Sequence, residues 1–353
     1  MEVVGRRDEF CIAPDPVGRM TQPVSGRATD EGGAPDIMIV EDVAGPTLDA
    51  LATRYKVVRD EQLWMDHEAL EARLAGVRAL VVRNRTQVDR RLLQAGKDLR
   101  VVARAGAGLD NVDVAAADEL GIVVVAAVGG ENARSVAELA LGLGIALARR
   151  VVDLDRDVRN GGWDRKPGLE LAGRTWGLVG LGRTGLATGE LARGIGMEVV
   201  GYDPYVAADD PRLGRSAIRK LDLDELLPAA DVVSLHVALD ASTRHLVDDG
   251  FLARMLPGAL LINVSRGEIV DEPAVAAAIG SGHLGGAALD VRTTEPAGPG
   301  PFQGLDRVIL TPHVGGLTGA AQDRVTAAIA EELDRVLQGL PARAPVGKWS
   351  QPR

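Results

Sequence analysis

The chain has 353 residues, of which 46% are hydrophobic, so it is long enough for two domains that each bury a core. Aromatic residues make up only 3%, and a core built instead from Ala, Val, Leu and Ile suits parallel sheets covered by helices. The formal net charge is −10 and no basic cluster stands out, which argues against a nucleic-acid partner.

Cysteine usage and hydropathy bear on the compartment. Cys11 is the only cysteine, which excludes an internal disulfide and a cysteine-based metal site and is typical of a reducing environment. No apolar run is long enough to span a bilayer, and the first ten residues lack the apolar core of a signal peptide. We therefore expect a cytoplasmic protein with no metal and no membrane partner.

Both ends of the chain lack the periodicity of regular structure. Residues 1–35 are rich in Gly, Pro, Arg and Asp, and we expect a disordered extension there. The alternative is an ordered strap over a partner subunit. The tail, 341–353, reads as loop.

From residue 36 onward, short apolar runs alternate with segments of helical period, which is typical of βαβ units and a parallel sheet. The predicted strands of the first block are 37–41, 56–59, 78–83, 100–104 and 122–126. The predicted helices between them are 45–55, 66–75, 87–96 and 112–120. Five strands in this pattern predict a small doubly wound, flavodoxin-like domain.

A long helical stretch, 132–161, follows the first block and could bridge two domains; Ser135 and Glu138 have the spacing of a capping box. The strands predicted after it are 175–179, 197–202, 231–236, 259–264, 286–291 and 307–310. The helices predicted with them are 184–194, 222–229, 248–255, 271–280 and 319–339. Six strands in this order predict a Rossmann domain. No strand follows the last helix, so we expect it to return to the first domain.

These patterns predict an α/β protein of two doubly wound parallel-sheet domains. We assign 36–131 together with 312–340 to a substrate-binding domain. We assign 132–311 to an NAD-binding domain.

A glycine-rich turn follows the first strand of the second block. Gly180, Gly182 and Gly185 have the G-x-G-x-x-G spacing, with Arg183 and Thr184 between the last two. The glycines would allow a tight turn, close approach of a pyrophosphate, and close packing of helix on strand, while the helix N-terminus offers free N–H groups to phosphate. The alternative is an ordinary tight turn between a strand and a helix.

An acidic residue ends the next strand. Asp203 lies roughly 20 residues beyond the glycines, where a carboxylate would bind the ribose hydroxyls and repel a 2′-phosphate. No arginine follows immediately, because Pro204 and Tyr205 come next. We therefore expect NAD rather than NADP as the cofactor, although an Asp that merely starts a loop is the alternative.

Hydride transfer to a ketone requires a proton donor and a cation for the substrate carboxylate. Arg266, Glu295 and His313 each follow a different predicted strand, at the sheet edge where Rossmann ligands bind, and Asp290 lies on one of these strands. A carboxylate on the far ring nitrogen of His313 would fix its tautomer and favour its charged form. Each residue also has an ordinary interpretation, as a surface arginine, a solvated loop acid or a capping histidine.

The remaining histidines are weaker candidates. His67 and His283 lie in ordinary helix or loop contexts, and His245 lies in a polar loop. His236 ends a strand near the nucleotide turn, so we expect it to be structural or adjacent to the cofactor.

The chain resembles the D-isomer-specific 2-hydroxyacid dehydrogenase family, and within it the D-3-phosphoglycerate dehydrogenases most, over about residues 36–340. The segments that carry the resemblance are GLDNVD, NARSVAELALGL, GLVGLGRTG, YDPY, FLARMLPGALLINVSRG, LDV, TEP and LTPH. The resemblance implies two domains with the active site in the cleft between them, which a hinge motion closes. It also implies a homodimer paired through the nucleotide domains.

The resemblance also implies roles for individual residues. Arg266 would bind the substrate carboxylate and carbonyl, and Glu295 would orient His313, the general acid in reduction and base in oxidation. Asp290 would contact the nicotinamide end of the cofactor and Asp203 the adenosine ribose.

Further roles come from the first domain. Main-chain groups of Ala105, Gly106 and Ala107 would cradle the substrate, and Arg83 and Arg85 match a loop that helps to bind a distal anion. We therefore expect hydride transfer at C2 of a D-2-hydroxy acid, 3-phosphoglycerate or a similar dianion.

The chain departs from the family in two loops. Ala126, Ala127 and Val128 stand where Asn-Ala-Pro is common, and 238–240 read Ala-Leu-Asp instead of Pro-Leu-Thr. These changes bear on the identity of the substrate more than on the chemistry, and a glyoxylate or hydroxypyruvate reductase is an alternative. An NAD-sensing corepressor-like binding protein is a separate alternative. Because the sequence ends at residue 353, we expect no regulatory domain and no feedback control by serine.

Overall fold

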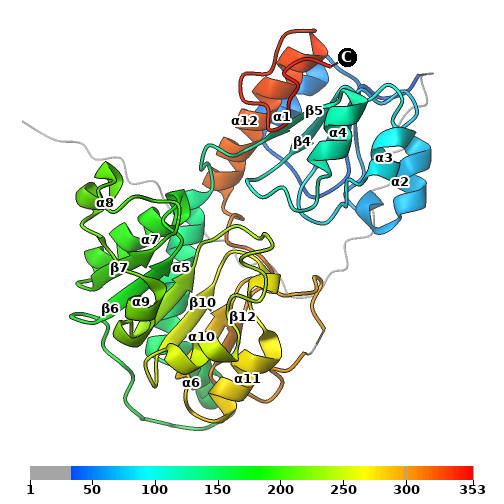
Figure 1. The fold of residues 1–353 in the computed structure, drawn as a ribbon. Coiled ribbons are helices and arrows are strands. Elements are labelled where there is room, and N and C mark those ends of the chain that lie inside the picture. The colour runs from blue at the N-terminus through cyan, green and yellow to red at the C-terminus, as the bar shows by residue number, and fades with distance from the viewer. Residues whose placement is uncertain (1–32, 299, 353) are drawn as a thin grey trace, which may run out of the picture. The chain divides into compact units, whose positions relative to one another are not determined.

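A computed structural model describes residues 33–298 and 300–352. Two all-parallel sheets with flanking helices make up the fold, the first drawn in blue to cyan and the second in green to orange in Figure 1. The predicted α/β class with two parallel sheets is therefore confirmed. The predicted extension, 1–35, lies outside the described residues except for 33–35.

The first sheet has the strand order β2-β1-β3-β4-β5, which is the flavodoxin-like order. Its strands are Ile37–Ile39, Val57–Arg59, Ala79–Val82, Val101–Arg104 and Val123–Ala126, for β1 to β5 in turn. Except in β2, their Val, Ile, Leu and Ala side chains are buried or nearly so, as expected for strands covered by helices on both faces.

Four α-helices cross over between these strands. They are α1 (Pro46–Ala50), α2 (His67–Arg73), α3 (Arg90–Ala95) and α4 (Val114–Leu120), and short 3₁₀ turns cover Leu51–Thr53 and Leu63–Met65. An aspartate caps the start of three of them, since the carboxylates of Asp66, Asp89 and Asp113 each accept a hydrogen bond from a main-chain N–H of the first turn.

The second sheet has the order β12-β11-β10-β9-β6-β7-β8. It is the Rossmann order with one more strand at the β12 edge. All strands are parallel, and the side on which successive strands are added changes between β6 and β9. The strands are Thr175–Val179, Glu198–Tyr202, Arg219–Lys220, Val232–Leu235, Leu260–Asn263, Gly286–Leu289 and Val308–Leu310, for β6 to β12 in turn. The helices are α5 (Ala133–Ala148), α6 (Val151–Arg159), α7 (Arg183–Gly194), α8 (Pro211–Ser216), α9 (Leu223–Ala229), α10 (Asp249–Arg254), α11 (Glu272–Gly280) and α12 (Gly319–Leu337), with a 3₁₀ turn at Gly267–Ile269.

The long helix predicted over 132–161 is wrong as a single element. It is divided into α5 and α6 at Arg150, whose backbone is left-handed with φ 55°. The carbonyl of Ala148 accepts a hydrogen bond from the amide of Leu169, so it is not available to continue the helix. The predicted capping box is also absent, because Ser135 donates to the carbonyl of Gly315 and Glu138 pairs with Arg134.

One helix and one strand were not predicted. Helix α8 and the two-residue strand β8 lie in the segment after β7, for which no element was predicted. The signal was present, since Asp210 caps α8 and Pro211 takes its first position. Strand β8 pairs with β7 and raises the sheet from six predicted strands to seven.

The last helix returns to the first sheet, as predicted. Helix α12 packs against α1, β4 and β5, and its Val325, Ile329 and Leu333 are buried in the same core as β1 and β3 (Figure 1). The tail beyond it has no helix or strand, but Pro345 forms a bridge with Val125. The domain boundaries themselves stay a prediction.

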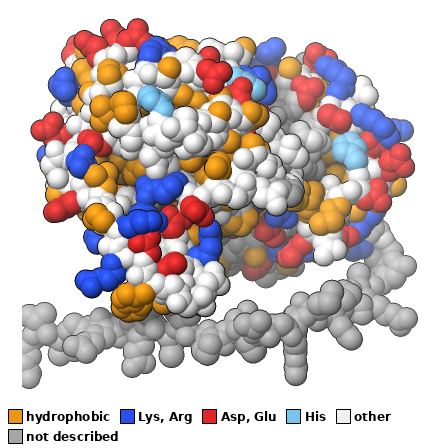
Figure 2. All heavy atoms as spheres, turned by 90° about the horizontal axis from the view of Figure 1, so that it is seen from below, with side chains coloured by type: hydrophobic (Ala, Val, Ile, Leu, Met, Phe, Trp, Pro, Cys, Tyr) orange, Lys and Arg blue, Asp and Glu red, His pale blue; other side chains and the backbone are white. Residues whose placement is uncertain are grey.

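Surface charge is mixed on the face drawn in Figure 2. Basic side chains there are interspersed with acidic ones and form no continuous patch. Within the described residues, no helix combines the length and the hydropathy that a membrane span requires.

Candidate active site

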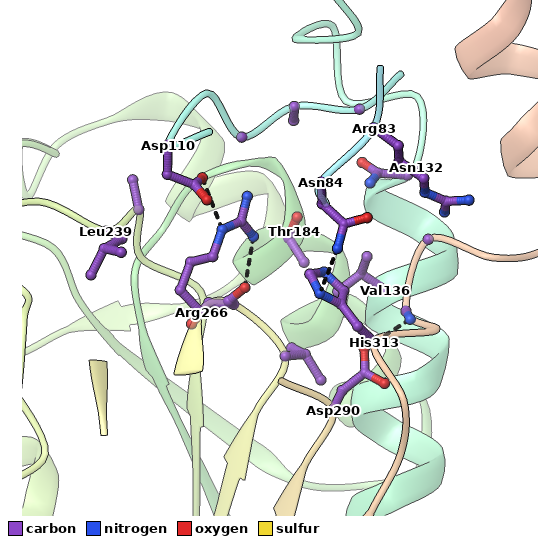
Figure 3. Close-up of a pocket in the computed structure, with 18 of the residues that line it drawn as sticks. Arg83, Asn84, Asp110, Asn132, Val136, Thr184, Leu239, Arg266, Asp290 and His313 are labelled. Carbon is purple, nitrogen blue, oxygen red and sulfur yellow. Dashed lines mark hydrogen bonds and ion pairs between the residues drawn. The ribbon is translucent and has the colours of Figure 1, made fainter. Parts of the chain in front are cut away.

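A cavity of about 600 Å³ lies where loops of the two sheets meet. Figure 3 shows Arg266 and His313 on segments that follow strands of the second sheet, with Asn84 and Asp110 reaching toward them from loops of the first sheet. All four residues follow the carboxyl ends of parallel strands, which is where α/β sheets bind their ligands.

The glycine turn after β6 requires its glycines. Gly180 has φ 104°, and a Cβ on it would lie 2.7 Å from the carbonyl of His236. A Cβ on Gly185 would lie 2.0 Å from the carbonyl oxygen of Gly180. Helix α7 starts directly after Gly182, with no side chain capping its first amides. The turn and the uncapped helix therefore fit a phosphate, and the cradle is suited to a dinucleotide.

Residues beside this turn are also positioned as a nucleotide-binding site requires. Asp203 follows β7, and its carboxylate accepts hydrogen bonds from the amides of Leu181 and Tyr205, both at 2.9 Å. The carboxylate therefore lies next to the glycine turn and also fixes the conformation of its backbone. Thr184 lines the cavity, while Arg183 is exposed and packs over Gly130.

His236 lies behind the turn and lines the same cavity. Its Nε2 is 2.8 Å from the Ser234 hydroxyl, which also accepts a hydrogen bond from the Trp176 indole. Burial lowers the pKa of His236 to about 3, so this ring is neutral and is no proton donor at neutral pH.

The proposed proton donor has its carboxylate partner. His313 Nδ1 is 2.8 Å from Glu295 Oε2 and 3.4 Å from Asn84 Nδ2, and no described residue is hydrogen-bonded to Nε2. Burial raises the pKa of Glu295, but the hydrogen bond from His313 and the charges around it outweigh burial, and the pKa is lowered. An ionised Glu295 therefore holds the proton on Nδ1 and leaves Nε2 for the substrate.

Asp290 fixes the loop that carries His313. Its buried carboxylate accepts hydrogen bonds from the Thr311 hydroxyl and from the amides of Val314 and Gly315, at 2.6 to 2.9 Å. His313 itself is left-handed, with φ 57°, and its amide donates to the main-chain carbonyl of Asp290. Asp290 lines the cavity, but both of its oxygens already have partners.

Arg266 is held at the opposite side of the cavity. Its Nε lies 2.9 Å from Asp110, and its Nη1 donates to the carbonyl of Ser265 at 2.7 Å. Its Nη2 occupies the space of the missing Cβ of Gly108. The guanidinium is thereby fixed in orientation and has edges left for a carboxylate.

The residues predicted from the first domain divide into two groups. Ala105, Gly106, Ala107 and Arg83 line the cavity with Arg266 and His313. Arg85 does not: its guanidinium stacks on Trp64, 5.0 Å from the ring centre, and faces a second cavity of about 400 Å³. The indole holds the planar guanidinium in place, and a role of Arg85 in binding a distal anion stays a prediction.

Known proteins with this arrangement were found by sequence and by structure. Residues 141–315 match the model of the D-isomer specific 2-hydroxyacid dehydrogenase, NAD binding domain. An (S)-sulfolactate dehydrogenase of Chromohalobacter salexigens is 44% identical over 306 residues, covering 86% of this chain and 98% of the relative.

The chain belongs to the D-isomer-specific 2-hydroxyacid dehydrogenase family. A D-3-phosphoglycerate dehydrogenase of Archaeoglobus fulgidus is 38% identical over 310 residues, covering 87% of this chain and 58% of that protein. The chain thus spans little more than half the length of this relative.

Solved structures share its fold. The TT0316 protein of Thermus thermophilus superposes with a TM-score of 0.81 and 35% identity, covering 88% of this chain and 99% of that one. A glyoxylate reductase of Paecilomyes thermophila superposes with a TM-score of 0.77 at 26% identity, covering 89% and 99%.

Two site residues of this family member were missed. Arg104 ends β4 and lines the cavity, and Glu41 follows β1. The rule that selected Arg266, a charged residue at the carboxyl end of a strand, would also have selected both.

Glu41 shapes the loop after β3. It is fully buried, and its carboxylate accepts hydrogen bonds from the amides of Arg83, Arg85 and Thr86 and from the Thr86 hydroxyl, at 2.8 to 3.0 Å. Glu41 therefore holds in place the loop from which Arg83 and Asn84 line the cavity.

We expect Glu41→Gln to lower the free energy of unfolding by about 3 kcal/mol, because the amide turns a donor toward buried N–H groups. Urea denaturation measures this loss. Glu119→Gln removes an exposed carboxylate paired with Arg90, and should leave the stability unchanged. Equal stability of the two variants would contradict the role of Glu41.

Proposed function

We propose that the protein is an NAD-dependent dehydrogenase that interconverts a D-2-hydroxy acid and its 2-oxo acid. The arrangement that carries the proposal is His313, held by Glu295, and Arg266 lining one cavity, beside a glycine turn that fits a dinucleotide. The D configuration rests on family membership alone.

The chain's own residues divide the work. In reduction, Arg266 binds the carboxylate at C1 and polarises the carbonyl at C2, and His313 gives its Nε2 proton to the oxygen as the alkoxide forms. In oxidation, the neutral ring takes the hydroxyl proton, and Glu295 stabilises the resulting imidazolium. The nicotinamide, when bound, donates or accepts the hydride at C2. Gly180, Gly182 and Gly185 with the start of α7 would hold its phosphates, and Asp203 the adenosine ribose.

NAD is the proposed cofactor in preference to NADP. The support is Asp203, whose carboxylate lies beside the glycine turn and would repel a 2′-phosphate. A comparison of NADH with NADPH belongs in every assay described below.

The proposed substrate is a dianion, 3-phosphoglycerate or a 2-hydroxy acid with a similar second charge. Relatives named for phosphoglycerate and for (S)-sulfolactate both support this. Their configurations agree, because sulfur outranks the carboxylate in the priority rules and reverses the stereochemical label. A glyoxylate or hydroxypyruvate reductase is the second candidate, and the glyoxylate reductase among the solved structures favours it.

A substrate panel tests the proposal. Steady-state rates are measured for phosphoglycerate, sulfolactate, malate, glycerate and lactate in oxidation, and for the matching 2-oxo acids in reduction. We expect the highest kcat/KM with a substrate that carries a second anion. Higher efficiency with glyoxylate or hydroxypyruvate would favour the reductase, and NADH binding without turnover on any member would favour a binding protein.

We also propose a cytoplasmic homodimer. The only cysteine, Cys11, supports a reducing compartment. Exposed apolar side chains in the region of α5 and α6 support a dimer. These are Ile145, Val151, Val152, Val158 and Trp163, of which Trp163 is 78% exposed. Sedimentation equilibrium should give twice the chain mass, and Val151→Asp with Val158→Asp should shift the protein to monomer. A monomeric wild type would contradict the dimer.

A further inference from the structure

The loop that carries Glu295 is exposed, yet the Glu295 carboxylate is bonded on both sides. Residues 293–298, which follow β11, form no helix or strand and lie at the surface. Oε2 of Glu295 lies 2.8 Å from Nδ1 of His313, and Oε1 accepts a hydrogen bond from the main-chain amide of Arg292 at 3.1 Å. An exposed loop keeps such a geometry only where other contacts anchor it.

A buried ion pair anchors the loop where it leaves the sheet. The Arg292 guanidinium donates two parallel hydrogen bonds to the carboxylate of Glu272 on α11, from Nε at 2.9 Å and from Nη2 at 2.8 Å. The two side chains are only 8% and 11% exposed. The same carboxylate accepts a hydrogen bond from the main-chain amide of Thr293 at 2.9 Å. Glu272 thus fixes the side chain of Arg292 and also the next peptide, two residues before Glu295.

Arg292 also contacts the chain where it returns from the loop. Its guanidinium carbon lies over the ring of Phe302, 5.0 Å from the ring centre, and Phe302 belongs to the core of the second sheet. A Cβ on Gly300 would lie 2.4 Å from Nη2 of Arg292, so the backbone passes directly against the guanidinium. One side chain therefore holds the protein on both sides of the exposed segment.

The Glu272 side of this pair is ionised. Burial raises the pKa of Glu272, but the hydrogen bonds from Arg292 and Thr293 outweigh burial, and the pKa is lowered. Two buried charges add little net stability, because the loss of hydration offsets their attraction. What a carboxylate and a guanidinium joined by two hydrogen bonds do supply is one fixed relative orientation.

Neither residue is placed to act on the substrate directly. Glu272 and Arg292 do not line the cavity of Arg266 and His313, and Arg292 lines the second cavity with its guanidinium bound to Glu272. We propose that the Glu272–Arg292 pair positions Glu295 and thereby holds the His313 ring in the orientation that proton transfer requires. This inference rests on the proposed dehydrogenase function. It makes Glu272 and Arg292 positioning residues that act through Glu295.

A double-mutant cycle tests the proposal. Glu272→Gln combined with Arg292→Met removes both charges together, so no buried charge is left unpaired, and the glutamine keeps an acceptor for the Thr293 amide. The readout is the single-turnover rate of reduction with NADH and the best 2-oxo acid of the substrate panel. We expect the combined variant to lower this rate about tenfold, with KM and the Kd of NADH within about threefold of the wild-type values.

The same change in a Glu295→Gln background separates positioning from a purely structural role. Glu295→Gln removes the group through which the pair acts, so the further loss of rate should be less than about twofold. A pair that only stabilises the fold would lower the rate by the same factor in both backgrounds. That result, or an unchanged rate in the combined variant, would overturn the proposal.

Arg174 and Asp231 provide the matched control. Arg174 donates to the Asp231 carboxylate at 2.7 Å, and that carboxylate also accepts a hydrogen bond from the amide of the residue after the arginine, Thr175, at 3.0 Å. This repeats the Glu272–Arg292 arrangement at the amino ends of β6 and β9, opposite the edge that carries the site. Asp231→Asn combined with Arg174→Met should therefore keep the wild-type rate.

Thermal unfolding checks that the combined variant is folded at the assay temperature. If it is not, Arg292→Lys takes its place in the same cycle, because lysine keeps the charge without the paired hydrogen bonds. We expect a smaller loss of rate from Arg292→Lys, and this loss should also disappear in the Glu295→Gln background. An equal loss in both backgrounds would again overturn the proposal.

The remaining outcomes distinguish this inference from the proposed function. A wild type without turnover on any member of the panel would overturn both. An active wild type in which Glu295→Gln keeps the full rate would overturn only the inference, because Glu295 would then make no contribution for the Glu272–Arg292 pair to support.

Discussion

Replacing His313 with glutamine should lower kcat by about 10²–10⁴-fold, because glutamine cannot transfer a proton in the transition state. The Kd of NADH should stay within about threefold of the wild-type value, since the residue is placed at the substrate and not at the phosphates. Stopped-flow reduction of the best panel substrate gives the rate, and quenching of protein fluorescence gives the Kd. The loop should hold its shape, because the main-chain amide of residue 313 still donates to Asp290.

The matched control is His67→Gln, the same change in a partly exposed histidine that contacts Glu71 on α2. It should leave both constants unchanged. Wild-type turnover in the His313 variant would refute its role as proton donor. Glu295→Gln keeps an acceptor for Nδ1 but removes the charge, so we expect a smaller loss than in the histidine variant. The pKa of Glu295 is below its usual value, so its contribution should disappear only as the pH falls through that lowered pKa.

Replacing Arg266 with lysine should lower kcat/KM by about 10²–10³-fold, because an ammonium cannot donate the two parallel hydrogen bonds that a carboxylate accepts from a guanidinium. The substitution should lower kcat as well as raise KM, since the same group polarises the carbonyl as it becomes an alkoxide. Initial rates over a range of substrate concentrations separate the two constants.

Arg254→Lys provides the control, because Arg254 forms an exposed pair with Asp224 on the surface of the second domain. Its kinetics should equal those of the wild type. If Arg266→Lys retained full kcat/KM, neither carboxylate binding nor carbonyl polarisation could be assigned to Arg266. Thermal unfolding checks that the lost bond to Asp110 has not destabilised the fold.

The candidate site could be predicted because parallel sheets collect their strand ends at one edge. Arg266, Glu295 and His313 were selected by their positions after strands, and the structure brings them to one cavity region although they are far apart in sequence. The glycine spacing was equally informative, because the close contacts of Gly180 and Gly185 leave no room for a side chain. Strand order and the return of the last helix followed from the same rules.

What could not be predicted depends on pairings between side chains. Nothing in the local sequence shows that the guanidinium of Arg85 would stack on Trp64. The break at Arg150 depends on Leu169, which bonds to the end of α5 from well outside the helix.

The left-handed backbone of His313 lowers the stability of the fold, although the side chain at that position is needed for activity. A non-glycine residue in this conformation costs about 1–2 kcal/mol, and Asp290 supplies the main-chain and side-chain acceptors that hold the loop there. Glycine would relieve the strain and abolish proton transfer. Selection for thermal stability alone would therefore replace histidine at residue 313. An engineering campaign that ranks variants by melting temperature should exclude this position, because its apparent improvements would be inactive proteins.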